Sequence, residues 1–250
     1  LVRADFSGTD LSGAIRMNST FANCTLLTNV DFTDTDLSNV EYMNSTFSSC
    51  TSLTSILVTK SLLPKVKYFS QTYYGCTSLV TVEMDFPTAV YYTGCFTNCT
   101  SLTSLTLKNA VELGSISHIA EGCSSLNSFV LVNCSYKDVY FYFNDGFIAA
   151  FKNCTSLQSI DLSSLSLSEG RHKAQFNDMF YGCTNLTSVT LPSVGDYSSS
   201  IYYGGPMWLQ NMFKGCTSLR ELNMTGWNLQ QVVDMESMFE DCSSLREIDL

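Results

Sequence analysis

The fold is decided by the stretch Phe96-Thr97-Asn98-Cys99-Thr100-Ser101-Leu102-Thr103-Ser104-Leu105-Thr106-Leu107. Its pattern, F-x-x-C-[TS]-x-L-x-x-Φ-x-Φ with Φ an apolar residue, recurs around nine cysteines that lie 26, 26, 23, 24, 31, 29, 33 and 26 residues apart. A unit of this length that repeats along a chain is typical of a solenoid, in which each unit stacks on its neighbours. The nine cysteines are Cys24, Cys50, Cys76, Cys99, Cys123, Cys154, Cys183, Cys216 and Cys242.

Further apolar columns accompany these cysteines. A leucine stands three residues after each cysteine, and the residue three before it is aromatic in every unit except one, which has Ala120. Because all of these positions are apolar, we expect them to face the interior of the solenoid. The residues seven before each cysteine are never polar either; they are Met17, Met43, Phe69, Tyr92, Ile116, Phe147, Phe176, Leu209 and Met235.

Each unit has two halves. The half after the cysteine alternates apolar and polar residues, as in Leu105-Thr106-Leu107, which predicts a strand with its apolar residues inward. The half before the cysteine repeats its apolar residues at intervals of three, three and four, as in Leu37, Val40, Met43 and Phe47. This second spacing suits either a helical turn or a tight extended corner, and spacing alone does not separate the two.

Several stretches resemble a known family of repeats. M-F-Y-G-C-T-N-L-T-S-V-T-L-P at 179–192 and F-T-N-C-T-S-L-T-S-L at 96–105 look like the BspA-type leucine-rich repeats of microbial surface proteins. The segment from Gly226 to Cys242, with its tryptophan and paired methionines, is similar to a related surface-protein repeat. The resemblance covers essentially the whole chain. It implies a leucine-rich repeat solenoid, a right-handed superhelix with a parallel β-sheet on one face and short helical or extended segments on the other.

The whole chain, 1–250, is expected to form a single array. A partial repeat at 1–10 precedes the nine units, because Ala4–Leu11 aligns with Val30–Leu37. The chain also stops at the last strand position of its final unit. Since terminal repeats of a solenoid normally carry a distinct polar cap, we expect this sequence to be a fragment of a longer protein.

Composition and charge exclude several classes of function. With 13 basic and 23 acidic residues the formal charge is −10, which would repel a nucleic-acid backbone. No window approaches the ~20 apolar residues of a membrane span, so we expect no direct membrane insertion.

Catalysis is not expected. His118 and His172 are the only histidines and lie in different units, and the chain has no glycine-rich phosphate loop. Cys95 and Cys99 are four residues apart, but Cys99 belongs to the repeated column, so the indication of a metal site is weak. We therefore expect no enzyme activity, no cofactor and no metal.

The repeated cysteines are expected to form a buried column, because a thiol packs as a small apolar group. Stacked strands lie ~4.8 Å apart, close enough for a disulfide, but side chains in a parallel ladder point the same way and disfavour one. Cys95 and Cys134 lie outside the column and are the candidates for exposed or paired thiols. Sequons for glycosylation occur at eight asparagines and are left open: Asn18, Asn23, Asn44, Asn98, Asn133, Asn153, Asn185 and Asn223.

The outward face of the sheet is the first candidate binding surface, because solenoids commonly bind partners on such faces. It is lined by the residues five and seven after each cysteine, which are mostly small and polar. The alternative is a plain solvated sheet, since small hydroxyl residues suit strands in any case. The candidate ligand-binding residues are the acidic ones near its C-terminal end: Asp161, Glu221, Glu247 and Asp249.

Three long connections form the second candidate surface. Segments 132–140, 163–169 and 192–202 all follow a strand, so they should emerge side by side at one edge, and such insertions often mark a binding face. Their aromatic residues offer large contact areas with a polar group, although the tyrosines could also pack down onto the repeats. The candidates are Tyr136, Tyr140, Tyr197 and Tyr202 within these connections, and Tyr203 and Trp208 just beyond the third.

The resemblance implies a noncatalytic adhesion or ligand-binding domain, secreted or at a cell surface. Its partner would be a protein or glycan, such as host matrix proteins, host cells or other microbes. Two alternatives stay open: a structural spacer that projects another domain, and a repeat array attached to an enzyme outside this sequence.

Overall fold

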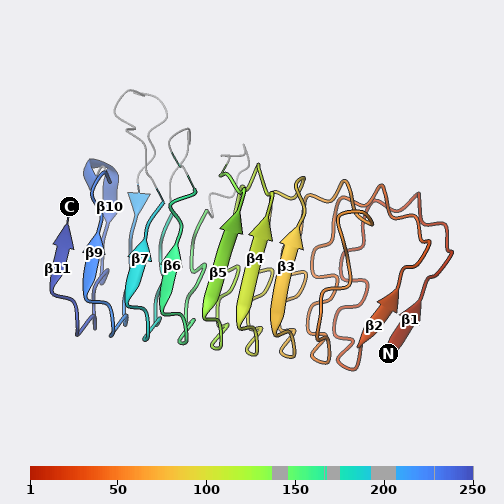
Figure 1. The fold of residues 1–250 in the computed structure, drawn as a ribbon, viewed down its shortest axis with the longest axis horizontal. Helices are drawn as coiled ribbons and strands as arrows, with labels where there is room; N and C mark the ends of the chain where they lie inside the picture. Colours follow the sequence, from red (N-terminus) through yellow and green to blue (C-terminus); the bar gives the residue numbers. More distant parts are fainter. Residues whose placement is uncertain (137–145, 166, 168–174, 193–206, 228, 250) are drawn as a thin grey trace.

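The computed structural model describes residues 1–136, 146–165, 167, 175–192, 207–227 and 229–249. These residues form a parallel β-solenoid whose successive units lie side by side along its long axis, with the chain termini at opposite ends (Figure 1). The prediction of a repeat solenoid is therefore confirmed.

The strands after the cysteines line one face of the solenoid (Figure 1). They are parallel and group into a two-stranded sheet, a three-stranded sheet and two further two-stranded sheets: β1 (Arg3–Asp5) with β2 (Asn29–Asp31); β3 (Thr81–Asp85), β4 (Ser104–Lys108) and β5 (Ser128–Val132); β6 (Ser159–Asp161) with β7 (Ser188–Thr190); and β9 (Glu221–Asn223) with β11 (Glu247–Asp249). A fifth sheet, β8 (Met207–Trp208) paired with β10 (Val232–Asp234), lies in the halves before the cysteines, beside the 3-10 helix η2 (Leu229–Gln231).

The register of the strands places equivalent residues next to one another. Leu105 lies opposite Val82 in one neighbour and Phe129 in the other. Leu105 and Leu107 are fully buried, whereas Ser104 and Thr106 are partly exposed. The predicted alternation of inward apolar and outward polar residues is therefore confirmed.

The half before each cysteine is a run of three overlapping β-turns. In the unit of Cys50, for example, the amides of Thr46, Ser48 and Cys50 each donate to the carbonyl three residues earlier. Two residues of this run, Ser45 and Ser49, have positive φ angles of 55° and 59°. Residues five and one before the cysteine have positive φ in all nine units, so the backbone turns repeatedly instead of continuing as a helix.

These turns make a second hydrogen-bonded ladder on the side opposite the sheet, which we call the turn ladder. The amides seven, five, three and one residue before each cysteine donate to carbonyls of the next unit; in one unit Phe47 donates to Thr72 over 2.9 Å and Ser49 to Tyr74 over 2.6 Å. The same four bonds occur at all eight interfaces between the nine units. Backbone groups that would otherwise be buried without partners are thereby satisfied along the described length of the solenoid.

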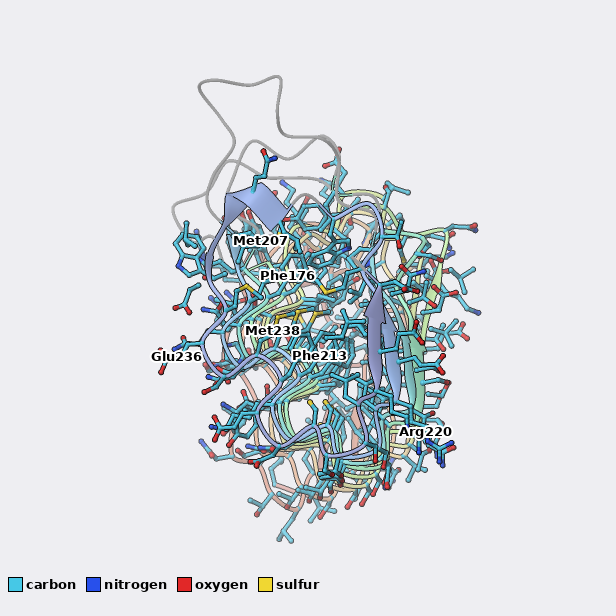
Figure 2. All side chains as sticks on the ribbon, turned by 90° about the vertical axis from the view of Figure 1, so that its left-hand side faces the viewer. Phe176, Met207, Phe213, Arg220, Glu236 and Met238 are labelled. Atoms are coloured by element: carbon cyan, nitrogen blue, oxygen red, sulfur yellow. The ribbon has the colours of Figure 1, made fainter. Side chains whose placement is uncertain are left out.

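The core lies between the sheet and the turn ladder. In Figure 2, Phe176, Phe213 and Met238 lie between these two walls, whereas Glu236 and Arg220 project from opposite sides. The rings three residues before the cysteines stack along the axis; Phe213 lies 5.4 Å from Phe180, and the two ring planes are 15° apart. Such stacks bury large apolar areas at every interface between units.

One place in the aromatic stack has no ring, because the residue there is Ala120. Phe129, at an inward strand position that is Val, Leu or Ile in the other units, places its ring 4.8 Å from that of Phe151, edge-on. Phe129 and Ala120 are 5% and 0% exposed. A large strand residue thus accompanies the small turn residue, as close packing of the core requires.

The repeated cysteines form the predicted column. Eight of them donate a thiol hydrogen bond to the carbonyl of the residue three before the preceding cysteine, as Cys183 does to Phe151 over 3.0 Å. Burial raises the pKa of Cys183 to about 12 and that of Cys50 to about 11. All eleven cysteines are free thiols.

The expectation that Cys95 and Cys134 are exposed or paired is wrong. Cys95 is 0% and Cys134 is 6% exposed, and both belong to the apolar core. Cys134 donates its thiol hydrogen to the carbonyl of Leu107 over 3.3 Å. Both cysteines fill inward positions outside the repeated column. Their absence from that column therefore did not mean that they are exposed to solvent.

Candidate binding surfaces

The outward face of the sheet presents the acidic residues that the sequence singled out. Asp161 on β6, Glu221 on β9, and Glu247 and Asp249 on β11 are all exposed. The register places Glu247 beside Glu221, so two carboxylates lie next to each other on this face. Like charges in that position repel each other and favour a cationic partner.

The outward sheet is interrupted between the units of Cys183 and Cys216. Strands β7 and β9 belong to neighbouring units but to different sheets, and we call the line between them the seam. At intact parallel pairs the amide four residues after the cysteine bonds to the same position of the preceding unit, as Arg246 does to Arg220 over 2.9 Å. In the described part of the chain, no such bond joins Arg220 to Thr187 across the seam.

A shallow depression of about 500 Å³ opens along the seam on the outward face. Carboxylates and an arginine surround a floor of small polar and apolar residues. Hydroxyl, amide, carboxylate and guanidinium groups therefore converge on one place and supply both hydrogen-bond donors and acceptors. The lining residues are Thr187, Ser188, Val189, Arg220, Glu221, Leu222, Asn223, Glu247 and Asp249.

A second hollow, of about 410 Å³, lies at the edge where β6, β7 and β9 end. Ser163, Pro192 and Trp227 are among the residues that line it. Trp227 is only 9% exposed; its indole N–H donates to the carbonyl of Pro192 over 3.2 Å, and its ring lies 5.0 Å from that of Phe176. Trp227 therefore serves mainly to close the core at this edge.

The ends of two strands at this edge are fixed by polar side chains. An oxygen of Asp161 accepts the amide of Ser163 over 2.9 Å, and an oxygen of Asn223 accepts that of Thr225 over 2.8 Å. The hydrogen bonds from Ser163 lower the pKa of Asp161, so that residue stays charged at neutral pH. Asp161 is thus exposed to solvent and also stabilises the turn after β6.

Two of the six predicted aromatic residues, Tyr136 and Trp208, lie within the described chain. Tyr136 is half-buried, with its ring 5.5 Å from that of Phe147, and it pairs with Leu113 in a parallel bridge. Trp208 is half-buried in β8 beside Gln175, in the half of the unit that forms the turn ladder. The other four candidates, Tyr140, Tyr197, Tyr202 and Tyr203, lie outside the described residues, as do most of the three long connections.

A column of tyrosines was missed by the sequence reasoning. Tyr42, Tyr68 and Tyr91 stand eight residues before their cysteines and stack with ring centroids 4.5 and 5.2 Å apart. The guanidinium of Arg16 lies 4.5 Å from the ring centroid of Tyr42. Their spacings of 26 and 23 residues equal those of the cysteines, and that signal could have revealed the column.

The described residues contain no cluster of three or more His, Cys, Asp or Glu arranged to hold a metal ion. His118 contacts Glu121 over 2.7 Å, and this hydrogen bond lowers the pKa of Glu121. The other histidine, His172, lies outside the described residues. Across those same described ranges, no helix has the length and hydrophobicity needed to span a bilayer.

Three solved structures that this chain resembles have low sequence identity to it. A leucine-rich repeat protein from Bacteroides ovatus ATCC 8483 is 19% identical, with 99% of this chain and 84% of that chain covered and a TM-score of 0.30. An internalin, inlF, from Listeria monocytogenes is 13% identical, with coverages of 90% and 81% and a TM-score of 0.33. A chain of the TLR13-ssRNA13 complex is 14% identical, with a TM-score of 0.38. The match covers 94% of this chain but only 38% of that chain.

No curated protein sequence matches the chain significantly. The family model for the BspA type leucine-rich repeat region, in contrast, matches six copies at residues 15–145, 115–206 and 148–250. The matched segments together run from Ile15 to Leu250 and include all nine repeated cysteines. The chain therefore belongs to the family of BspA-type leucine-rich repeat proteins.

Proposed function

We propose that this chain is a noncatalytic protein-binding domain that acts at a microbial cell surface or in secreted form. Its membership of a leucine-rich repeat family supports a role in protein interaction. The surface location follows the resemblance to repeats of microbial surface proteins. Adhesion to matrix proteins, to host cells or to other microbes is the biological role that this location favours.

The observation that carries the proposal is the depression along the seam. Flat strand surfaces offer only a few side chains at a time, whereas this depression brings groups of β7, β9 and β11 together. Glu221, Glu247 and Asp249 surround it, and Arg220 is the one basic side chain among its lining residues. A ligand segment with exposed lysine or arginine residues complements this charge, so we propose that a basic segment of a partner protein docks here.

The experiment measures binding of the folded chain to an immobilised panel of extracellular matrix proteins and to a lysine- and arginine-rich peptide. The test variant replaces Glu221 and Glu247 by Gln and Asp249 by Asn. The control replaces Glu41, Glu112 and Glu236 by Gln, which changes the net charge equally in the halves before the cysteines. We expect affinity to fall by about tenfold or more in the test variant and to change little in the control.

Repeating the experiment at several salt concentrations tests the electrostatic contribution to binding. Binding through exposed charges weakens as ionic strength rises, because the Debye length falls from about 10 Å at 0.1 M to about 3 Å at 1 M. Equal losses in both variants would mean nonspecific attraction to an acidic protein and would contradict a site at the seam.

A second candidate function, a rigid spacer, is favoured by the turn ladder. The same four backbone bonds join every pair of units, and such a repeated interface resists bending. A folded chain that binds nothing on the panel at low salt would support the spacer and contradict the binding proposal. A variant with the three long connections shortened to about four residues, typical of short links, would test whether recognition instead uses that edge.

A further inference from the structure

The turn at each cysteine shows a pairing of asparagine with glycine that points to a second site. The residue just before the cysteine always has positive φ. Asn98 and Asn153 occupy this position, and the next unit has Gly122 or Gly182 there. A Cβ on either glycine would lie 2.3 or 2.4 Å from the asparagine oxygen, so each asparagine side chain occupies the space over the following glycine.

Among the glycines at this position, Gly215 differs because the residue at the same turn position in the preceding unit is Gly182, which has no side chain. A Cβ on Gly215 would find its nearest neighbour, the Cα of Gly182, at 3.6 Å, because no side chain covers this glycine. The space remains as a hollow of about 530 Å³ on the surface of the turns. Its lining residues are Tyr181, Gly182, Thr184, Lys214, Gly215, Thr217, Asp241 and Ser243.

The lining offers both donors and acceptors around a backbone floor. Thr217 donates its hydroxyl hydrogen to the carbonyl of Thr184 over 3.1 Å, so its lone pairs can accept. The Lys214 ammonium forms an ion pair with the Glu240 carboxylate over 2.7 Å. The carboxylate balances its charge, and the ammonium keeps further N–H groups that can donate to a ligand. The ring of Tyr181 forms one wall, and the Lys152 ammonium lies 4.8 Å from the centroid of that ring.

This chemistry selects among ligand classes. An anion such as phosphate would approach Asp241 and Glu240, and the only ammonium in the lining is already paired. A purely apolar ligand would leave the hydroxyls, carboxylate and ammonium without partners. A neutral ligand with several hydroxyl groups can donate to Asp241 and accept from Lys214, while its C–H groups rest on the glycine backbone and the Tyr181 ring.

We propose that this hollow binds a neutral sugar residue. The site lies on the turns, apart from the outward sheet face, and does not depend on the protein-binding proposal. Replacing Gly215 by Asn tests it, because asparagine tolerates positive φ and stands at this position in three other units. The new side chain would fill the hollow as Asn153 fills the space over Gly182.

The control is Ser49→Asn, which introduces the same residue at the same turn position far from the hollow. Ser49 has a φ of 59° and is followed by Gly75, so the asparagine repeats the natural pairing there. Both variants should retain the circular dichroism spectrum and melting temperature of the parent chain.

Binding is measured by NMR or calorimetric titration of the whole chain with glucose, galactose, mannose and N-acetylglucosamine, and with inorganic phosphate. We expect saturable binding of at least one sugar in the millimolar range, weakened about tenfold or more by Gly215→Asn and unchanged by Ser49→Asn. Absence of saturation by every sugar would overturn the proposal. So would equal binding by the parent and a folded Gly215→Asn chain, or binding of phosphate in place of sugar.

Discussion

The two faces of the solenoid differ between the units of Cys183 and Cys216, whose cysteines are separated by 33 residues. On the turn side the four ladder bonds are all present: Phe176 to Trp208, Asp178 to Gln210, Phe180 to Met212 and Gly182 to Lys214, at 2.8 to 3.0 Å. On the sheet side, β7 and β9 belong to separate sheets. The turns and the core therefore hold these units together, and the sheet can change at the seam without loss of the stack.

The largest expected effect comes from the core beside the turns. Phe180 is fully buried, and its ring lies 5.7 Å from that of Phe151 and 5.4 Å from that of Phe213. Phe180→Ala should lower the free energy of unfolding by about 3 to 5 kcal/mol, because it removes a large side chain and leaves a cavity. Leu157→Ala, also fully buried, should cost about 2 to 5 kcal/mol.

Chemical denaturation measures both changes. Val130→Ala on the outward face is the control, because Val130 is 42% exposed and should cost less than about 0.5 kcal/mol. A loss below about 1 kcal/mol at both buried sites would contradict the view that this core holds the units together.

Two glycines of the turns should respond differently to alanine. Both Gly182 and Gly215 have positive φ, of 72° and 74°, so either substitution incurs the cost of a left-handed residue, about 1 kcal/mol. At Gly182 the new Cβ would also meet the Asn153 oxygen at 2.4 Å, whereas at Gly215 it has room. We expect losses in unfolding free energy of about 2 to 3 kcal/mol for Gly182→Ala and about 1 kcal/mol for Gly215→Ala.

Thermal and denaturant unfolding would measure this difference. Adding Asn153→Gly to Gly182→Ala removes the colliding side chain at a position that already has a φ of 60°. The double variant should recover most of the extra loss. If the two single variants are equally stable, the asparagine side chain does not restrict the turn.

Hydrogen exchange compares the two faces at the seam directly. The amides of Asp178 and Phe180 donate across the interface over 2.9 and 2.8 Å, whereas that of Arg220 makes no bond to β7 in the described part of the chain. We expect Arg220 to exchange at least about tenfold faster than the two ladder amides, a difference of about 1.4 kcal/mol in opening free energy. Equal protection would mean that the sheet is closed at the seam in solution.

An exposed ion pair on the intact part of the sheet should matter least. Lys108 lies 2.7 Å from Glu83, and the two side chains are 33% and 59% exposed. Lys108→Met should change the free energy of unfolding by less than about 0.5 kcal/mol, because solvent screens such pairs. Denaturation at low and high salt measures this change; a loss above about 1 kcal/mol would mean that the exposed sheet face contributes substantially to stability.

The sequence allowed the solenoid, the parallel strands and the buried cysteines to be predicted, because these features recur at fixed distances from Cys24 through Cys242. The overlapping turns could not be predicted from the sequence, because apolar spacings of three and four suit helices and turns alike. The clue lay in residues such as Asn98, Asn153 and Gly182 just before the cysteines, which tolerate positive φ. Cys95 and Cys134 were misjudged because their burial depends on tertiary packing.

The candidate surfaces were predicted less completely. The exposure of Glu221 and Asp249 followed from strand alternation, but the seam beside them depends on how two backbones separate in space. The hollow at Gly215 depends on which side chain covers which glycine, a relation between residues in adjacent units. Neither relation appears in the periodicity of a single unit.

The thiol column has a consequence for how the protein must be made. An unfolded chain carries eleven thiols with ordinary reactivity, whereas in the folded solenoid burial raises the pKa of thiols such as Cys76 and Cys123 to about 12. Because the thiolate is the reactive form, the folded column resists oxidants that would scramble the nascent chain. In an oxidising environment, stacking of the units would therefore compete with oxidation of the thiols of the unfolded chain.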